Sequence, residues 1–395
     1  MKTAQTITIL LTLAMLSCCN RAPEAPMESG PVISLEKSDV IDLSPYLEDI
    51  RLIPLEGHPG SLFSQADHMV LEGSDLYIMD KTLKAIICFD TTGRFRYRIQ
   101  RVGKGPGEYP ELNGFWIRPE KKELYLHSRI PPKILVYDLE GHYLRETPVD
   151  YGAHEMTGLG KDMVTAFSIF NSYRGRDSIS PGIFLMREDG AFIRQNKPIG
   201  EYTPYWAVNY QRHMEKFEDG LLVMSQSDTI YRVEANGRVS IDMILDPGKM
   251  EMPDELRQVP FNSPQQPQIF NSSYMQCKDQ LIAFGPIRLF WFSKENQQHF
   301  VLIDKKLSKG YYSQSIQNSH TLFPTVFPIG SGNQDELVGI YNMDVIWLLQ
   351  ESLEASRTER PDNLALKGIE KIIQEAIAQD RPIVYIARVK KEWLN

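Results

Sequence analysis

The sequence predicts an all-β fold, a six-bladed β-propeller, from three observations. A unit of short apolar strands joined by polar loops recurs, with starts about 40 to 60 residues apart, a spacing typical of propeller blades. Four copies carry a glycine at the same hairpin turn, namely Gly93, Gly141, Gly190 and Gly237. Glycine adopts the left-handed backbone that such turns require. With 395 residues, 42% of them hydrophobic, the chain can fill a large closed β fold.

The first copy, Leu76–Ile99, shows the repeat most fully. It predicts strands at Leu76–Met79, Ala85–Asp90 and Phe95–Ile99, then a glycine-rich crossover and the next strand at Phe115–Ile117. The later copies are Leu124–Val149, Val164–Ile199, Leu221–Leu245, a weaker fifth at Leu281–Ile316 and an interrupted sixth at Leu337–Leu349. We expect the sixth copy to begin with one long strand.

Closure of the ring is predicted to use both ends of the chain. Apolar residues at i, i+3 and i+4 predict one short C-terminal helix, about 363–379, before a last strand at Ile383–Val389. The missing outer strand of this unit is expected at Ile50–Leu55, with Val32–Asp42 beside it. Pairing first and last strands leaves no open edge. The helix is expected to cover the closing unit.

The N-terminus predicts export and a lipid anchor. Lys2 precedes a ten-residue apolar run, Ile7–Leu16, which suits a secretory signal and is too short to span a membrane. The following Ser17-Cys18-Cys19 completes a stretch that resembles a bacterial lipobox, which implies lipidation of Cys18; Cys19 and an unlipidated signal peptide are the alternatives. We expect residues 1–18 to be the signal peptide, 19–32 a flexible tether and 33–395 the propeller.

The charge and the cysteine content of the chain limit its possible binding partners and disulfides. The net charge is −8 with both signs interspersed, which argues against a nucleic-acid partner, since that requires a basic stripe. Cys88 and Cys277 lie in apolar runs far apart, so we expect buried thiols rather than a disulfide. We expect a monomer that meets the membrane through its lipid anchor only.

Two groups of motifs resemble known families. Gly103, Gly105, Gly107, Tyr109, Gly114 and Leu124-Tyr125-Leu126 resemble an NHL-type repeat, with Tyr109 where Phe is usual. More closely, GKGPGEY, SDTIYRVEANG and the terminal helix followed by RPIVYIARVK resemble six-bladed propeller lipoproteins of gut Bacteroidetes. The resemblance covers nearly the whole chain from Val32 and implies an outer-membrane lipoprotein in the cell envelope. Asn20-Arg21-Ala22 lacks the acidic residues that promote surface display, which favours a periplasm-facing protein.

The sequence favours a binding module over an enzyme. It contains no G-x-S-x-G elbow, H-E-x-x-H helix, phosphate loop or paired-cysteine zinc knuckle. We expect a cofactor-free scaffold that holds a peptide, glycan or envelope protein on its loop-rich face. The glycine crossover is expected near the axis. Candidate contacts on this face are Lys104, Glu108, Tyr109, Tyr173, Arg174, Arg176, Tyr205, Trp206 and Arg212; self-packing of these loops is the alternative.

A second hypothesis is a metal-assisted lyase or hydrolase. By the repeat register, His68, His154 and His213 lie near the starts of inner strands. Three imidazoles at one level of a central channel could hold one divalent metal and activate its water. Ordinary polar lining is the alternative, because a register shift of one residue turns strand side chains to the other face.

Overall fold

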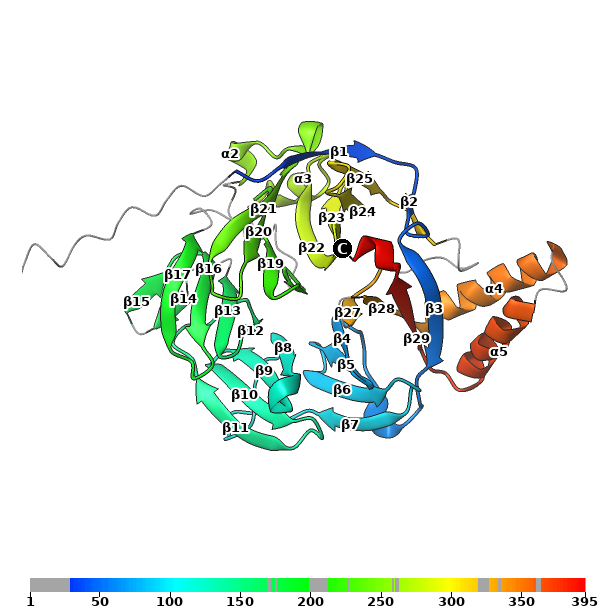
Figure 1. Cartoon of the computed structure of the whole chain (residues 1–395), viewed down its shortest axis with the longest axis horizontal. Helices are drawn as coiled ribbons and strands as arrows, with labels where there is room; N and C mark the ends of the chain where they lie inside the picture. Colours follow the sequence, from blue (N-terminus) through cyan, green and yellow to red (C-terminus); the bar gives the residue numbers. More distant parts are fainter. Residues whose placement is uncertain are drawn as a thin grey trace, which may run out of the picture.

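The computed structural model describes residues 29–168, 172–174, 176–198, 212–225, 227–257, 259, 263–318, 327–332, 335–359 and 364–394. Strands dominate these ranges, and their hydrogen-bonded order contains six antiparallel groups of four. The groups follow one another around a ring, with the first strand of each nearest the centre (Figure 1). The fold is therefore mostly β and propeller-like.

We number the four-stranded groups as units 1 to 6. Unit 1 is β4 (His68–Glu72), β5 (Asp75–Asp80), β6 (Ala85–Asp90) and β7 (Phe95–Ile99); unit 2 is β8 (Gly114–Arg118), β9 (Glu123–Arg129), β10 (Pro132–Asp138) and β11 (Tyr143–Pro148). Unit 3 is β12 (Glu155–Leu159), β13 (Met163–Ser168), β16 (Gly182–Arg187) and β17 (Phe192–Pro198), with a hairpin of β14 (Ser172–Arg174) and β15 (Asp177–Ile179) inserted.

The remaining units complete the ring. Unit 4 is β18 (Met214–Phe217), β19 (Gly220–Met224), β20 (Thr229–Val233) and β21 (Val239–Asp246); unit 5 is β22 (Gln276–Phe284), β23 (Ile287–Lys294), β24 (Gln297–Asp304) and β25 (Lys309–Ser313). Unit 6 is β27 (Gly330–Gly332), β28 (Glu336–Tyr341), β29 (Ile383–Val389) and β3 (Leu47–Pro54). Outside the units lie β1 (Val32–Lys37), β2 (Ile41–Asp42), β26 (Ile316–Gln317), the short helices α2 (Asp254–Arg257) and α3 (Gln266–Phe270), and 3₁₀ turns at Pro59–Ser61, Pro119–Lys121, Gly248–Met250 and Lys391–Trp393.

The predicted glycine turns are confirmed. Gly93, Gly141, Gly190 and Gly237 have φ angles of 86°, 86°, 85° and 82°, in the left-handed region that favours glycine. Each closes the hairpin between the last two strands of its unit, and the Gly93 amide donates to the Asp90 carbonyl at 2.9 Å. A Cβ on Gly93 would lie 2.1 Å from the carbonyl oxygen of Pro54, so this turn of unit 1 fits closely against β3 of unit 6.

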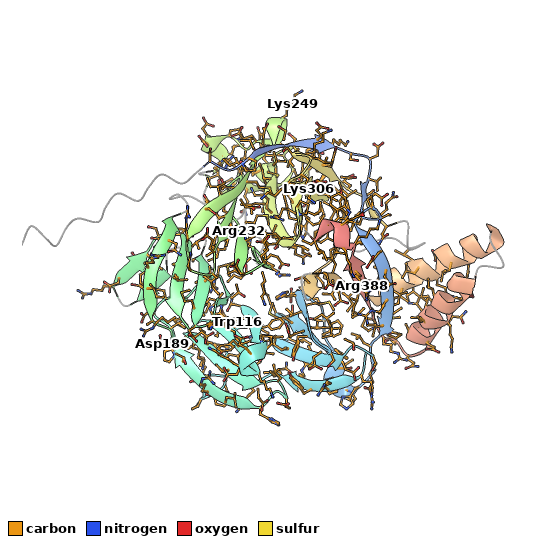
Figure 2. The ribbon with its side chains drawn as sticks, in the orientation of Figure 1. Trp116, Asp189, Arg232, Lys249, Lys306 and Arg388 are labelled. Atoms are coloured by element: carbon orange, nitrogen blue, oxygen red, sulfur yellow. The ribbon has the colours of Figure 1, made fainter. Side chains whose placement is uncertain are left out.

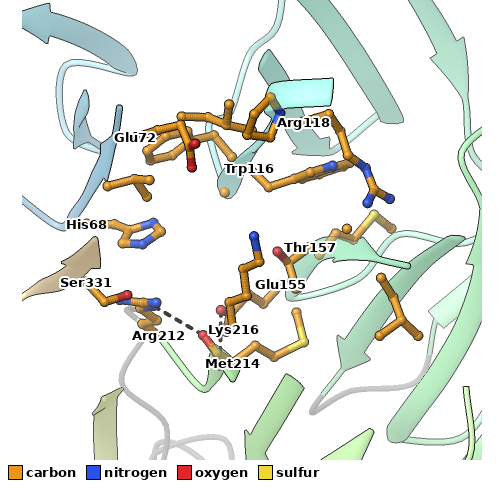
Figure 3. A pocket seen from close by; sticks show the side chains of 18 of the residues that line it. His68, Glu72, Trp116, Arg118, Glu155, Thr157, Arg212, Met214, Lys216 and Ser331 are labelled. Carbon is orange, nitrogen blue, oxygen red and sulfur yellow. Dashed lines mark hydrogen bonds between the residues drawn. The ribbon is translucent and has the colours of Figure 1, made fainter. Parts of the chain in front are cut away.

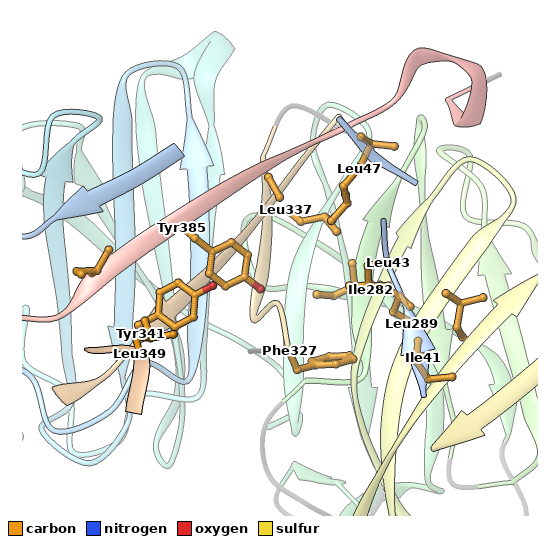
Figure 4. Packing of buried hydrophobic residues seen from close by; sticks show 14 of the residues in the cluster. Ile41, Leu43, Leu47, Ile282, Leu289, Phe327, Leu337, Tyr341, Leu349 and Tyr385 are labelled. Atoms are coloured by element: carbon orange, nitrogen blue, oxygen red, sulfur yellow. The ribbon is translucent and has the colours of Figure 1, made fainter. Parts of the chain in front are cut away.

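Neighbouring units pack through hydrophobic clusters, and one such cluster fills each of the six interfaces around the ring. Between units 5 and 6, Leu289 and Ile282 face Leu337 and Tyr385, as Figure 4 shows. Between units 6 and 1, Val384 meets residues of β4 and β5. Burial of apolar surface between the sheets, rather than hydrogen bonding between them, therefore holds most of the ring together.

The two ends of the chain meet in unit 6. β3 pairs antiparallel with β29, as expected for Ile50–Leu55, and β29 has the predicted bounds. The expectation for Val32–Asp42 is wrong: β1 instead lies between the outer strands β21 and β25, parallel to both, and β2 pairs with β26. The buried Ile33 side chain explains the place of β1, because it fills the cluster between units 4 and 5.

The predicted single helix and long sixth strand need correction. β28 ends at Tyr341, and a second helix, α4 (Met343–Glu359), precedes the expected one, α5 (Leu364–Ala378). Asn342 starts α4, since its side chain accepts a hydrogen bond from the Val345 amide at 3.0 Å. The helices lie at the outer edge of the ring beside β3 (Figure 1), where Ile346 and Ile373 join the cluster between units 5 and 6.

Cys88 and Cys277 are buried and not joined in a disulfide, as expected. Burial raises the pKa of each thiol to about 12. Among the described helices, none has the length and apolar character needed to cross a membrane.

Candidate functional site

The inner strands enclose a cavity of about 510 Å³ at the centre of the ring. Most of its wall comes from β4, β8, β12 and β18, and Ala283 of β22 and Ser331 of β27 complete it, so all six units contribute. Figure 3 shows the polar side chains of these strands directed toward a shared space. Pockets of this size suit small ligands.

Arg212, two residues before β18, lines the end of the cavity at which the inner strands begin; we call this end the floor. Only 8% of its side chain is exposed. Its amide donates to Asp279 Oδ1 at 2.7 Å, its Nε donates to the Met214 carbonyl at 3.2 Å, and its guanidinium pairs with Glu215. Burial lowers the pKa of Arg212 to about 10, although Glu155 and Asp279 oppose the shift, so the group remains charged at neutral pH.

One guanidinium nitrogen of Arg212 lacks a hydrogen bond. Nη1 is buried and has no hydrogen-bond partner within the described ranges. Leaving a buried donor unsatisfied is costly, so a buried donor without a partner calls for an explanation, such as a bound ligand or water. This nitrogen is therefore a candidate ligand contact.

Glu155, at the start of β12, has a structural task. Its carboxylate accepts hydrogen bonds from the His213 amide at 2.7 Å and the Met214 amide at 3.2 Å. These bonds join the inner strands of units 3 and 4. They also satisfy much of the carboxylate's hydrogen-bonding capacity, so Glu155 holds the floor in shape.

The three histidines lie where the repeat register placed them. His68 begins β4, while His154 and His213 immediately precede β12 and β18. The rings of His154 and His213 are 5.8 Å apart, and the His68 ring packs 5.1 Å from that of Phe115. No three His, Cys, Asp or Glu side chains of the described residues form a group that could hold a metal ion, so the geometry does not bring the predicted set together.

His68 and His154 are held neutral. Desolvation lowers the pKa of His68 well below its ordinary value, and the charges of Arg212 and Lys81 add to the effect. Burial does the same to the pKa of His154, with His213 the next cause. His68 alone of the three lines the cavity; its Nε2 is buried without a hydrogen-bond partner in the described structure.

Lys216 and Thr157 reach the middle of the cavity. Figure 3 shows the amine of Lys216, from β18, and the hydroxyl of Thr157, from β12, directed into the open space. Neither group has a hydrogen-bond or ion-pair partner among the described residues. They are therefore available to a ligand.

The cavity mouth is acidic. It lies at the far ends of the inner strands, where Glu72, Glu120 and Asp219 line it. Burial raises the pKa of Glu72; Lys216 opposes that shift and Glu120 adds to it. Glu218 pairs with Arg232 instead. This mouth lies beside the turns that join the first two strands of units 1, 2 and 4.

The crossover residues are placed differently from expectation. Glu108 accepts a hydrogen bond from the Gly105 amide at 2.9 Å, and Tyr109 is fully buried, with its hydroxyl donating to the Lys84 carbonyl at 3.0 Å. Tyr109 is thus a packing residue and not a ligand contact. The Gly107 amide donates to Glu146 of β11 at 2.9 Å, which places this loop by an outer strand and not near the axis. Lys104 is exposed.

The other predicted contacts divide into three groups. Tyr173 and Arg176 are exposed at the β14–β15 hairpin, to which Arg174 also belongs. Tyr205, Trp206 and the anchor Cys18 lie outside the described residues. Of the predicted site residues, Arg212 and His68 line the cavity.

Sequence reasoning missed Glu72, Thr157 and Lys216. A usable pattern was present, because polar residues stand at alternate positions of otherwise apolar inner strands: His68 and Glu72 in β4, Glu155 and Thr157 in β12. In a strand, alternate residues share one face. Arg118 has the same position in β8 but is bound to Glu188 at 2.7 Å.

The fold and the cavity define a propeller-like protein with a ligand-sized space at its centre. The chain belongs to the family "Domain of unknown function (DUF4934)", which matches residues 31–388. It is similar in structure to a candidate exported protein of Bacteroides fragilis, with a TM-score of 0.71, 17% identity, and coverage of 91% of this chain and 100% of that one.

A DUF4221-family member from Bacteroides vulgatus has a TM-score of 0.47 and 10% identity, with coverage of 87% of this chain and 97% of that one. No curated protein matches the sequence.

Proposed function

We propose that this protein is a six-bladed β-propeller lipoprotein of the cell envelope that binds a small ligand, or the end of a larger one, in its central cavity. The observation that carries the proposal is the cavity itself. It combines about 510 Å³ of space with polar groups, on Arg212, Thr157 and Lys216, that lack partners in the described structure. A concave site with a few convergent polar groups is the usual form of a ligand site.

Six blades are supported by the order of the strands. Each unit has four antiparallel strands, each interface has its own apolar cluster, and β3 pairs with β29 where the chain ends meet. The likeness to the Bacteroides fragilis structure, which covers 100% of that chain, shows that the two proteins share a fold. Closure of this kind removes open sheet edges and gives the cavity a rigid wall.

The proposed location rests on the N-terminal sequence. Lipidation of Cys18 would tether a monomer to the outer membrane through the flexible stretch 19–32, facing the periplasm. The likeness to a candidate exported protein supports export. A peptide, a glycan or part of an envelope protein could reach the cavity through its mouth.

Binding is tested by blocking the cavity. The detergent-extracted full-length protein is screened by saturation-transfer NMR against a mixed set of neutral, cationic and anionic fragments. Thr157→Trp should abolish the signals of a subset of fragments, because the indole would occupy space into which the Thr157 side chain points.

The matched control is Leu144→Trp, which adds the same side chain at an exposed position of β11. It should leave those signals unchanged. If no fragment loses its signal in Thr157→Trp while keeping it in Leu144→Trp, the cavity is not a binding site and the proposal fails.

A further inference from the structure

Hydrogen-bond donors, among them the cations Lys216 and Arg212, lie around one part of the cavity. Lys216 extends its amine into the centre, and Figure 3 shows Arg212, His68 and Ser331 around the same region. Buried Nη1 of Arg212 and Nε2 of His68 both lack hydrogen-bond partners in the described structure. The neutral imidazole can donate from Nε2 in one tautomer.

The acids of this region are largely engaged. Glu155 accepts two backbone amide hydrogen bonds, Glu215 pairs with Arg212, and Asp279 accepts from the Arg212 amide. Glu72, Glu120 and Asp219 differ, because no hydrogen bond or ion pair to their carboxylates occurs in the described structure; of the three, Glu72 has a pKa that the charge of Lys216 lowers. An added monoanion therefore gains the charge of Lys216 and is opposed by Glu72 and, at the mouth, by Glu120 and Asp219.

The surrounding wall is apolar. Phe115, Met156 and Met214 line the cavity beside these polar groups, with Trp116 at its edge. Aromatic and thioether side chains pack well against a flat apolar body. The wall thus suits a ligand with an aromatic or aliphatic part next to its charged end.

We propose that the cavity selects a small organic carboxylate, whose anionic group lies by Lys216 and the Arg212–His68 floor and whose apolar body packs against Phe115, Met156 and Met214. The inference rests on the proposed binding function and specifies its ligand class. A carboxylate fits better than a doubly charged phosphate, since Lys216 is the cation here without an ion pair in the described ranges and Glu72 would repel the second charge.

Three probes of one shape test the charge: 3-phenylpropionate, 3-phenylpropanamide and 3-phenylpropylamine. Dissociation constants are measured by ligand-observed NMR with the full-length protein in detergent. The carboxylate should bind at least about tenfold more tightly than the amide, the difference expected for a hydrogen bond to a charged group. Thr157→Trp should abolish its binding.

Two neutralising variants should act in opposite directions. Lys216→Gln should weaken carboxylate binding about tenfold, while Glu72→Gln should strengthen it, and neither should change the affinity of the amide. If the two residues served only to maintain the structure, the two substitutions would not change carboxylate affinity in opposite directions. Lys249→Gln, on the outer edge of the ring (Figure 2), is the matched control and should have no effect.

The outcomes separate this inference from the proposed function. If the amide or the amine binds as tightly as the carboxylate and Thr157→Trp still blocks it, the cavity binds ligands but the carboxylate inference is wrong. If Lys216→Gln leaves carboxylate affinity unchanged, the inference also fails. If Thr157→Trp affects none of the three probes, the carboxylate inference is overturned, and the fragment screen decides the proposed function separately.

Discussion

At the scale of single residues, Arg288 shows how a buried charge is held between units 4 and 5. Its Nε donates to Asp242 Oδ2 at 3.1 Å, and its guanidinium carbon lies 4.3 Å from the centre of the Phe217 ring. Lys305 reaches the same carboxylate at 2.7 Å. Burial alone would raise the pKa of Asp242, but the two cations outweigh it and hold that pKa below its ordinary value of 3.8.

This depressed pKa predicts a pH-dependent stability. Because the folded pKa of Asp242 lies below the unfolded one, its stabilisation is present above about pH 4 and is lost as the pH falls through the folded pKa. Asp242→Asn should cost about 3 kcal/mol at pH 7, since it leaves Arg288 buried without its partner. The difference in the free energy of unfolding between Asp242→Asn and the wild-type protein should be smaller at pH 3 than at pH 7.

Urea denaturation at both pH values measures this effect. Asp254→Asn, whose parent side chain is 92% exposed, is the control and should match wild type. A stability gap for Asp242→Asn that stays constant between pH 7 and pH 3 would contradict the ion-pair account.

Site residues could be predicted from sequence only where the repeat register was clear. The starts of β4, β12 and β18 follow from the repeat, which is why the histidines were placed correctly. How deeply a side chain is buried, however, depends on the packing of neighbouring units, which the repeat register does not reveal. Tyr109 resembles a loop residue in sequence, yet the packing of unit 1 on unit 2 buries it completely.

At the scale of elements, β1 links units 4 and 5 by pairing with the outer strand of each. It extends from the outer strand β21 to the outer strand β25, pairing Ile33 with Leu245 and Leu35 with Gly310. A Cβ on Gly310 would lie 2.6 Å from Leu35 Cδ2, so glycine there permits the close approach. The N-terminal segment thus joins two units that are neighbours in the ring.

Ile33→Ala should weaken the attachment of β1 to units 4 and 5. The side chain is 1% exposed, and truncation of a buried isoleucine costs about 2–5 kcal/mol. Hydrogen exchange should accelerate at the Ile244 amide, which donates to the Pro31 carbonyl at 2.9 Å. Val32→Ala, at a 61% exposed position, should leave exchange unchanged. Equal exchange at Ile244 in the two variants would show that β1 does not hold these units.

Hairpins were the most predictable elements, and α4 and β1 the least. Within a hairpin, the turn glycine and the alternating apolar residues are local signals. The apolar run through Val345 and Leu349 contains no local signal that separates strand from helix, because a short apolar run is compatible with a strand or with the buried face of a helix. The partners of β1 are separated from it by most of the chain, so no local pattern identified them.

At the scale of the whole molecule, both ends of the chain stabilise the ring. β3 follows the tether closely in sequence, and it completes the unit that ends with β29. The tether leads directly into β1, so the lipid anchor proposed at Cys18 would hold the ring at units 4 and 5, where β1 pairs with β21 and β25. The central cavity draws its lining from all six units, so the shape of the cavity depends on that closure.

The anchor can be tested in bacterial cells. Metabolic labelling with an alkyne fatty acid should mark the wild-type protein and Cys19→Ala, while Cys18→Ala should lose the label and leave the membrane fraction. A label that persists in Cys18→Ala but disappears in Cys19→Ala would move the anchor by one residue. A label absent from the wild-type protein would contradict lipidation.

The most direct test of the central claim is a crystal structure of the protein soaked with the fragment that shows the strongest NMR signal sensitive to Thr157→Trp. We predict density for that fragment within the cavity, in contact with Lys216 and Phe115. Density found only on the outer loops, such as beside Tyr173, would contradict the account and show that ligands bind outside the ring.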